Sequence, residues 1–393
     1  MRPRALIVGA GIGGLTAAIA LARKGLEVAL FERAEALEEI GAGLQATPNA
    51  TRVLARLGVL QTVEAHALAP RAIRIIRGRD GAELARLQLN ATARWGAPYL
   101  VLHRADLQRA LLECAAREKS VALALGAEVA GFKEDAMGVT LGLRRGSIRL
   151  AESGDLLIGA DGLRSIVRER LGLGARGEAR FSGRVAFRAA VEASIAPARA
   201  CEPDISLELG ARAHLVHYPL RGGALVNIVA VIESDWRGAP EDDPWDGEAD
   251  QAALFAAFAS WSKEARRLIE AARGWRAWPL YDRAPLTTMA VGRVALIGDA
   301  AHPMLPFLAQ GAAQAIEDAG ALAECLAAAS EIPAALAAYS KRRLARVVRV
   351  QQAAADQARL YHLAGAAALI RDLGMRALGP ERLLQRYDWI YRE

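Results

Sequence analysis

A glycine-rich turn near the N-terminus constrains the fold more than any other feature of this 393-residue sequence. The turn has the pattern G-x-G-x-x-G over residues 9–14, and it follows a short apolar segment, 4–8. A helical pattern covers 11–24, and a second extended apolar segment covers 27–31. A strand, a tight turn, a helix and a second strand in this order predict a βαβ unit, the building block of an α/β sheet.

In such a unit the glycines serve a dinucleotide. Gly9, Gly11 and Gly14 would let the backbone approach a pyrophosphate, whose charge is favoured by the free N–H groups of the helix. Glu32, at the end of the second strand, is placed to accept ribose hydroxyls. The alternatives are an ordinary glycine-rich turn, or a signal peptide or membrane span over 5–22, and the glycines would weaken such an apolar helix.

The same glycine pattern recurs at 172–177, but there it follows a predicted helix and precedes strands. We interpret this second copy as a linker, because it lacks the strand and helix that a dinucleotide site requires. The chain is therefore expected to have one dinucleotide site and no second one for a resident nicotinamide.

Composition excludes several other classes of protein. The chain is 53% hydrophobic and 24% charged, which indicates a globular protein. Its net charge is +6, but 50 basic and 44 acidic residues are interspersed, so nucleic-acid binding is not expected. Three cysteines without a C-x-x-C pair predict no metal site and a reducing, cytoplasmic location. No other apolar segment is long enough to cross a membrane.

The predicted elements change in kind along the chain. Strands alone are predicted over 180–233, α/β patterns flank them, and helices follow residue 310. The predicted fold class is therefore α/β, with a Rossmann-like domain interrupted by a mixed or antiparallel β-sheet domain and followed by C-terminal helices. The predicted boundaries are 1–70, 98–178 and 280–328 for the dinucleotide-binding domain, 71–97 and 179–279 for the substrate-binding β domain, and 329–393 for the C-terminal helical segment.

Two further strands are predicted to end in an aspartate. Segment 155–160 leads into Asp161, and segment 294–298 leads into Asp299. Ligands of α/β sheets bind at the carboxyl ends of the strands, although either aspartate alone could be a turn former or a helix cap. Together with the glycine turn, they predict one ligand site at that edge of the sheet.

In this order, and over nearly the whole chain, the three motifs resemble those of the group A FAD-dependent aromatic hydroxylases, which share the para-hydroxybenzoate hydroxylase fold. Within that group the sequence is most similar to the salicylate, 3-hydroxybenzoate and 6-hydroxynicotinate hydroxylases. Segments 161–165 and 298–319 are the most specific parts of the resemblance.

The resemblance implies a tightly bound FAD and a set of residues that contact it. These residues are Gly9, Gly11, Gly14, Glu32, Arg33, Gln45, Arg104, Val129, Asp161, Asp299, Pro306, Gly311 and Ala312. Arg104 would reach a phosphate or the ribitol, Asp299 the ribitol hydroxyls, and Asp161 a surface shared with the nicotinamide. The helix that begins near Gly311 would point its positive end at the flavin. Ala309 stands where relatives often carry glycine.

The substrate side is implied by the resemblance and by strand geometry. Alternation places His214 and Tyr218 on one face of a strand and His217 on the other. His214 and Tyr218 match a histidine and a tyrosine of the substrate pocket, where they could orient a phenol and accept its proton. The alternative is two half-buried strand residues. Gln45 matches a flavin-contacting side chain and cannot act as a base, and His302 is interpreted as structural.

The implied activity is that of a monooxygenase. A transiently bound NADH or NADPH would reduce FAD, O2 would form a flavin C4a-hydroperoxide, and one oxygen atom would pass to a small phenolic or pyridine carboxylic acid. Two alternatives stay open: a hydroxylase of a larger polycyclic or quinone-precursor ring, and a flavin-binding redox sensor without turnover. A monomer or homodimer is expected, with no nucleic-acid or membrane partner.

Overall fold

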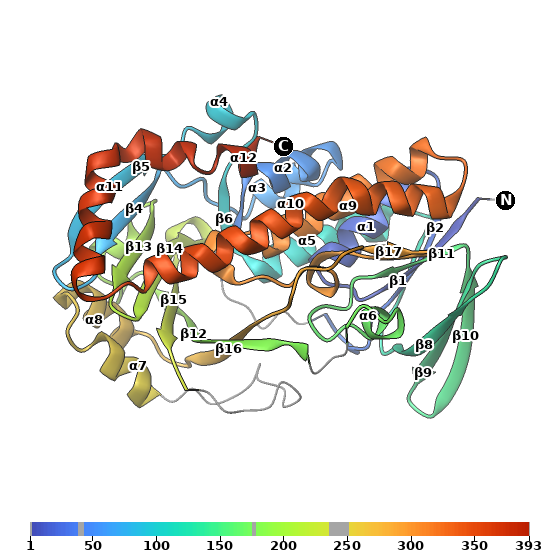
Figure 1. Ribbon diagram of the computed structural model, residues 1–393, viewed down its shortest axis with the longest axis horizontal. Coiled ribbons are helices and arrows are strands. Elements are labelled where there is room, and N and C mark those ends of the chain that lie inside the picture. The colour runs from blue at the N-terminus through green and yellow to red at the C-terminus, as the bar shows by residue number, and fades with distance from the viewer. Residues whose placement is uncertain (1, 38–42, 175–177, 236–250, 393) are drawn as a thin grey trace.

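The computed structural model describes residues 2–37, 43–174, 178–235 and 251–392. Figure 1 shows two sheet-containing halves side by side, with a long helix crossing both. Residues 175–177, at the end of the predicted linker, lie outside the described residues.

The first half is built on a sheet whose central strands are parallel. In spatial order its strands are β17 (Ala290–Val291), β18 (Val294–Leu296), β11 (Leu156–Gly159), β1 (Arg4–Val8), β2 (Glu27–Phe31) and β7 (Val121–Ala124). β1 pairs in parallel with both β2 and β11, and β11 pairs in parallel with β18. The carboxyl ends of these four strands therefore lie at one edge of the sheet.

Three helices and a small sheet complete the core of this half. Helices α1 (Ile12–Ala22), α5 (Arg104–Arg117) and α9 (Gly311–Ala328) pack together, with α1 in contact with both of the others. β8 (Glu128–Glu134), β9 (Val139–Arg145) and β10 (Ile148–Gly154) form an antiparallel sheet that shares the same apolar core. Burial on both faces is why β1 and β11 are continuous apolar runs.

The second half is a mixed sheet, as the sequence predicts. Its strands, in spatial order, are β16 (Arg276–Asp282), β12 (Arg180–Glu192), β15 (Leu225–Glu233), β14 (Ala213–Leu220), β13 (Ile205–Gly210), β4 (Ala72–Arg77) and β5 (Ala82–Gln88). All neighbours are antiparallel except β13 and β4. The hairpin of β4 and β5 thus joins the strands predicted over 180–233. The domain boundaries themselves stay a prediction.

Several elements connect the two halves. β3 (Gly43–Ala46) pairs with β6 (Leu100–His103), and α10 (Ile332–Tyr361) runs across both halves in Figure 1. α11 (Gly365–Gln385) packs on β5, and α12 (Asp388–Tyr391) ends the chain near α2. The remaining helices are α2 (Pro48–Arg56), α3 (Leu60–Glu64), α4 (Ala91–Trp95), α6 (Ile166–Arg170), α7 (Gln251–Phe258) and α8 (Lys263–Ala271).

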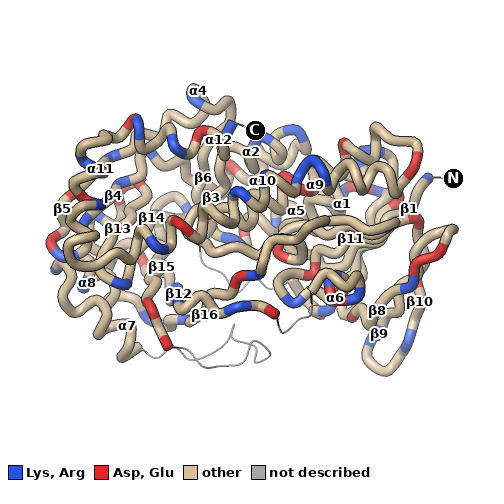
Figure 2. Tube along the Cα trace, viewed as in Figure 1, with Lys and Arg blue, Asp and Glu red and all other residues tan. Residues whose placement is uncertain are grey.

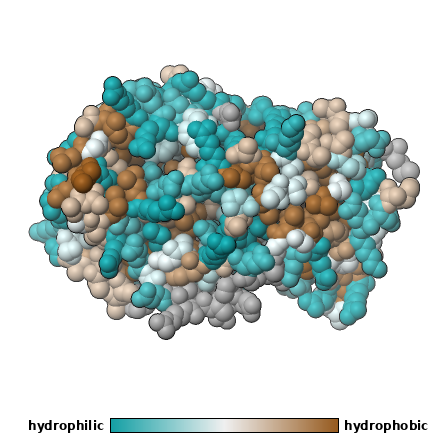
Figure 3. All heavy atoms as spheres, viewed as in Figure 1, coloured by the Kyte–Doolittle hydropathy of each residue, from teal (hydrophilic) through white to brown (hydrophobic). Residues whose placement is uncertain are grey.

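The surface mixes charges (Figure 2), and apolar side chains are exposed on α11. Figure 2 shows basic and acidic residues interspersed along both halves. Figure 3 shows an apolar patch at the left, where α11 lies in Figure 1, and α11 exposes Leu369, Ile370 and Leu373. None of the described helices combines the length and the apolar character needed to cross a bilayer.

Candidate functional site

The glycine-rich turn is so tight that Gly9 and Gly14 cannot carry a side chain without strain or collision. Gly9 has φ +99°, and a Cβ on Gly14 would lie 1.9 Å from the carbonyl oxygen of Gly9. Gly11 begins α1 without a side-chain cap, and a Cβ there would meet no atom within 4 Å. The first N–H groups of α1 therefore border a concave space beside Gly11 that no described side chain fills, and this space is called the cradle below. Such a cradle fits the pyrophosphate of a dinucleotide.

Glu32 is held at the rim of this cradle. Its carboxylate accepts hydrogen bonds from the N–H of Ala10 at 2.8 Å and the N–H of Ala34 at 3.0 Å. The N–H of Ala127 donates to the carbonyl of Glu32 at 2.8 Å, which starts the strand of Val129 beside Glu32. Arg33 is exposed next to it. These predicted residues therefore gather where the adenosine of a bound dinucleotide would lie.

Asp161 lies directly beside the glycine turn, but its oxygens are used within its own loop. A Cβ on Gly9 would lie 3.1 Å from the Cα of Asp161. The carboxylate accepts hydrogen bonds from Ser165 Oγ at 2.5 Å and from the N–H of Ile166 at 2.8 Å. Burial raises the pKa of Asp161. The structure thus shows Asp161 capping α6, the alternative that the sequence left open.

Asp299 stands on the same edge and remains accessible. It lies in a short 3-10 turn, 298–300, that follows β18. A Cβ on Gly311 would lie 4.0 Å from Asp299 Oδ1, so the turn abuts the start of α9. Surrounding protein raises the pKa of the Asp299 carboxyl, while the charges of His302 and Arg104 oppose that shift. Arg104, the first residue of α5, thus lies near enough to act on Asp299.

Asp318 on α9 fixes that turn. Its carboxylate accepts hydrogen bonds from the N–H of Gly298 at 2.9 Å, His302 Nε2 at 2.6 Å and Arg343 Nε at 2.7 Å. Burial alone would raise the pKa of Asp318, but His302 and Arg343 together lower it to about 2. His302 is buried and serves this network, in agreement with its structural interpretation.

The predicted flavin-side turn is held by a second buried network. Pro306 begins a 3-10 turn, 306–308, and Ala309 follows with φ +53°, a left-handed conformation that glycine adopts more readily. Gln310 is buried and donates to Thr47 Oγ1 at 3.0 Å. Gly311 and Ala312 then start α9, so the predicted residues lie together at the N-terminus of this helix.

A cavity of about 110 Å³ lies between the face of β14 and the C-terminal helices. An apolar cavity of about 150 Å³ holds benzene in another protein, so this cavity is on the scale of one aromatic ring. Its wall includes Gln45, Tyr99, Leu207, His214, Val216, Pro306, Phe307, Ala309, Gln357, Tyr361, Met375, Arg386, Tyr387 and Tyr391. The predicted flavin-side turn and the predicted substrate side therefore meet at one chamber.

The cavity brings together two of the three predicted catalytic residues. His214 is 4% exposed, with its ring 5.1 Å from that of Phe307, and Gln45 Oε1 accepts a hydrogen bond from Tyr99 at 2.6 Å. Tyr218 is not among the lining residues. Its ring packs against Gly43 instead, where a Cβ would lie 2.7 Å from Tyr218 Cε2.

The described residues that line the cavity include a neutral histidine, protonated tyrosines and one cation, but no carboxylate. Burial, together with His362 and Arg184, lowers the pKa of His214 well below its usual value, so His214 is a neutral imidazole. Burial raises the pKa of Tyr99 and Tyr391, which keeps these hydroxyls protonated. Arg386 is the one charged residue among those lining the cavity, and it forms no ion pair with any described residue.

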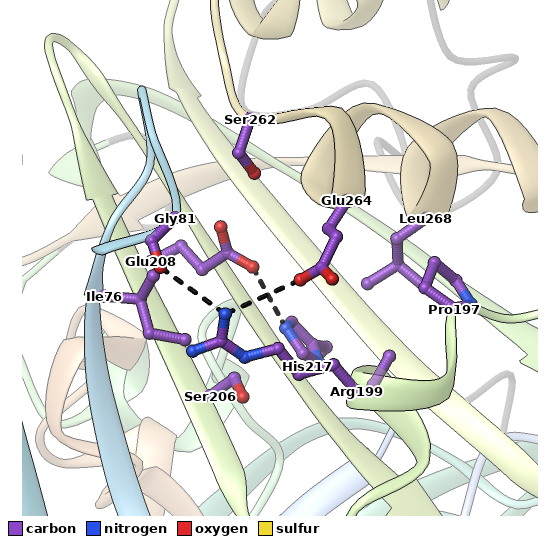
Figure 4. A pocket seen from close by; sticks show the side chains of 11 residues that line it. Ile76, Gly81, Pro197, Arg199, Ser206, Glu208, His217, Ser262, Glu264 and Leu268 are labelled. Atoms are coloured by element: carbon purple, nitrogen blue, oxygen red, sulfur yellow. Dashed lines mark hydrogen bonds and ion pairs between the residues drawn. The ribbon is translucent and has the colours of Figure 1, made fainter. Parts of the chain in front are cut away.

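A second, smaller cavity lies on the opposite face of β14. Figure 4 shows His217 pointing to Glu208 there, and the two side chains are 3.2 Å apart. This confirms the predicted alternation of His214 and His217. The volume of this second cavity, about 20 Å³, leaves room for little more than a water molecule. It is too small for an aromatic substrate.

Sequence reasoning missed the walls that the C-terminal helices supply. It assigned no site residue to 329–393, yet Tyr361, Arg386, Tyr387 and Tyr391 line the cavity. Four of the seven tyrosines in the chain are lining residues. Three of these four lie after residue 360, and this concentration is the one sequence signal that could have indicated the contribution of the C-terminal helices.

Comparisons with known proteins identify the family to which the chain belongs. The profile described as "FAD binding domain" matches residues 2–354. The 3-amino-4-hydroxybenzoate 2-monooxygenase PtnB3 of Streptomyces platensis is 39% identical over 99% of this chain and 96% of its own length. The 3-hydroxybenzoate 6-hydroxylase of Polaromonas naphthalenivorans is 34% identical over 98% of this chain and 95% of its own.

Solved structures give the same result. A salicylate hydroxylase in its substrate complex superposes with a TM-score of 0.84 at 28% identity, covering 100% of this chain and 96% of that one. HpxO of Klebsiella pneumoniae, complexed with FAD and uric acid, gives 0.86 at 27% identity, covering 98% and 96%. The chain therefore belongs to the FAD-binding-domain family and, within it, to the group A FAD-dependent aromatic hydroxylases.

Proposed function

We propose that this chain is an FAD-dependent monooxygenase that hydroxylates a small aromatic carboxylic acid, with NAD(P)H and O2 as co-substrates. The observation that carries the proposal is the ring-sized cavity at the flavin-side turn, with neutral His214 and cationic Arg386 in its wall. The relatives from Streptomyces platensis and Polaromonas naphthalenivorans are named for hydroxylated benzoates, which supports the same class of substrate for this chain.

FAD would be held along the carboxyl edge of the six-stranded sheet. The residues proposed to hold it are Gly9, Gly11, Gly14, Glu32, Arg33, Val129, Arg104, Asp161, Asp299, Gln45, Pro306, Gly311 and Ala312. FAD, when bound, supplies the redox and oxygen-activating chemistry that protein side chains lack. Asp161 would contribute by fixing its loop, because its own oxygens are already bonded to that loop.

The chain's own residues would bind and orient the acid. Arg386 would pair with the substrate carboxylate, because a guanidinium matches that group in shape and charge. His214, as a neutral imidazole, would accept the phenolic proton and so raise the electron density of the ring. Gln45 and Tyr99 would hold the flavin-side wall, and Tyr218 would support it from behind Gly43. The apolar walls would exclude water.

A substrate panel tests this proposal. NAD(P)H oxidation and O2 uptake by the purified holoprotein would be measured with 3-amino-4-hydroxybenzoate, 3-hydroxybenzoate, salicylate and 6-hydroxynicotinate. We expect at least one acid to stimulate oxidation and to yield one hydroxylated product per NAD(P)H, identified by mass and NMR. A yellow protein that responds to none of them would favour the redox sensor. The cavity volume already favours one ring over a polycyclic substrate.

Replacing Arg386 tests the binding of the carboxylate. We expect Arg386→Gln to raise KM for the acid about 10- to 100-fold, the loss of one charged hydrogen bond, with a smaller change in kcat. Arg382→Gln, in the last turn of α11 just before Arg386, exposed and outside the cavity, is the matched control. An unchanged KM in Arg386→Gln, in protein that keeps its FAD, would contradict this role.

A further inference from the structure

His214 is joined to the surface by two further side chains. Its Nδ1 lies 2.8 Å from Nε2 of His362, which follows the last residue of α10. His362 Nδ1 lies 3.5 Å from Glu233 Oε1 at the end of β15. The side chain of His362 is 1% exposed, whereas that of Glu233 is 39% exposed. The three residues thus lie in series from the cavity wall to solvent, joined by one short contact between the histidines and one longer contact to the carboxylate.

We propose that His214, His362 and Glu233 form a relay that carries the phenolic proton of the substrate out of the cavity. This proposal rests on the proposed function and adds to it a route for the proton. His362 does not line the cavity, so it would act through His214 as a positioning and relay residue.

The relay balances in protons. Before transfer, the relay requires His214 Nδ1–H to donate to His362 Nε2 and His362 Nδ1 to carry a proton toward Glu233, with Arg184 Nε turned away from that nitrogen. The phenol gives its proton to His214 Nε2, the Nδ1 proton of His214 moves to His362 Nε2, and the Nδ1 proton of His362 moves to Glu233. Glu233 then releases that proton to water. Both rings end neutral with the opposite tautomer, which is the one that fits the structure, since Arg184 Nε donates to His362 Nδ1 at 3.3 Å.

The surrounding charges make a relay necessary. Arg184 on β12 and Arg371 on α11 act on His362, and burial together with these cations lowers the pKa of His362 to about 3. His214 is equally unsuited to remain charged. A buried base that cannot keep a proton must pass it on. Glu233, which also faces Arg184 and Arg212 at 3.8 Å each, is the nearest carboxylate on this path.

The contacts also supply variants that separate relay from support. The carbonyl of His362 accepts a hydrogen bond from the N–H of Arg212 at 3.2 Å, and a substitution at 362 keeps this backbone contact. A glutamine at 362 can still hydrogen-bond to His214 but cannot exchange a proton between two ring nitrogens. His217→Gln is the matched control, because His217 is a buried histidine on the same strand with its own carboxylate partner (Figure 4).

The experiment compares the holoprotein with His362→Gln, Glu233→Gln and His217→Gln. The probe is 3-amino-4-hydroxybenzoate, or 3-hydroxybenzoate if the panel shows it to be the better substrate. Proton release on substrate binding is followed with an indicator dye in weak buffer, and kcat and KM are measured from pH 6 to 9. We expect His362→Gln to slow proton release and kcat by about 10- to 100-fold with little change in KM.

Glu233→Gln should slow proton release less than His362→Gln does, because the side chain at 233 is partly exposed and water can reach that end of the path. His217→Gln should release protons and turn over substrate as the wild type does, per folded molecule. Wild-type proton release and kcat in His362→Gln at every pH would overturn the relay. So would equal losses in His362→Gln and His217→Gln, which would indicate structural damage alone. A wild-type protein that forms no hydroxylated product would instead overturn the proposed function, a separate result.

Discussion

At the scale of single residues, two glycines of one turn should fail in different ways. A Cβ on Gly14 would collide with the backbone of Gly9, so we expect Gly14→Ala to lower the free energy of unfolding by about 3 kcal/mol or more. Gly11 has φ −71° and open space, so Gly11→Ala should fold normally but weaken FAD binding by about 1–3 kcal/mol. Urea unfolding of the apoprotein and flavin absorbance per protein check this. Equal stability losses in both variants would contradict it.

Residues whose role depends on local backbone geometry were predictable from the sequence. Glycine patterns report where a turn must be tight, and this is why the cradle and Glu32 were found. His214 was implied by the resemblance and placed on its strand face by alternation, but its partner His362 is 148 residues away and no local pattern links the two. Asp161 shows the limit of a motif, because the sequence could not tell a ligand-facing carboxylate from a helix cap.

At the scale of elements, α9 couples the two turns that are proposed to face FAD. Asp318 on this helix holds Gly298 and His302, and it neutralises the buried Arg343. We expect Asp318→Asn to lower the free energy of unfolding by about 3 kcal/mol or more, because Arg343 loses a buried partner, and to reduce FAD content. Denaturant unfolding measures the first effect and flavin absorbance the second.

A control on the same helix makes that result specific. Glu324 pairs with Arg56 at the surface, so Glu324→Gln should cost at most about 1 kcal/mol and leave FAD content unchanged. If Asp318→Asn were no more harmful than Glu324→Gln, the buried network could not be what fixes the turn.

The prediction of secondary-structure elements succeeded where the apolar pattern and the flanking turn residues indicated the same boundaries. The strand predicted over 4–8 is found at Arg4–Val8. Residues 251–271 contain two helices, α7 and α8, because Ser262 accepts a hydrogen bond from the N–H of Ala265 and starts a new helix. β10 was missed because its side chains are mostly exposed and leave no apolar alternation.

At the scale of the whole molecule, the site exists because distant elements meet. The turn at Pro306 belongs to the first half, His214 to the second sheet, and Arg386 to the C-terminal helices, yet all three line one cavity. The family resemblance implied the first two as site residues, whereas it implied none in the C-terminal helical segment. The third depends on how α11 lies over β5, a packing outcome that no motif reports.

The stability of the whole chain should carry the signature of the two buried histidines. His214 and His362 are neutral when folded, with pKa values below the unfolded value of about 6.5. Their contribution is complete above that pH. Below about pH 5.5 the unfolded chain binds protons that the folded chain does not, so stability should fall by about 1.4 kcal/mol per pH unit for each histidine.

For His362 this loss should continue to about pH 3, where the folded ring itself takes up a proton. Urea unfolding of the apoprotein between pH 4 and 7 measures the slope, and His362→Gln should reduce it by the share of one histidine. His66→Gln, at an exposed position, should leave the slope unchanged. An identical slope in wild type and His362→Gln would mean that His362 titrates normally, and the electrostatic argument for a neutral relay would then fail with it.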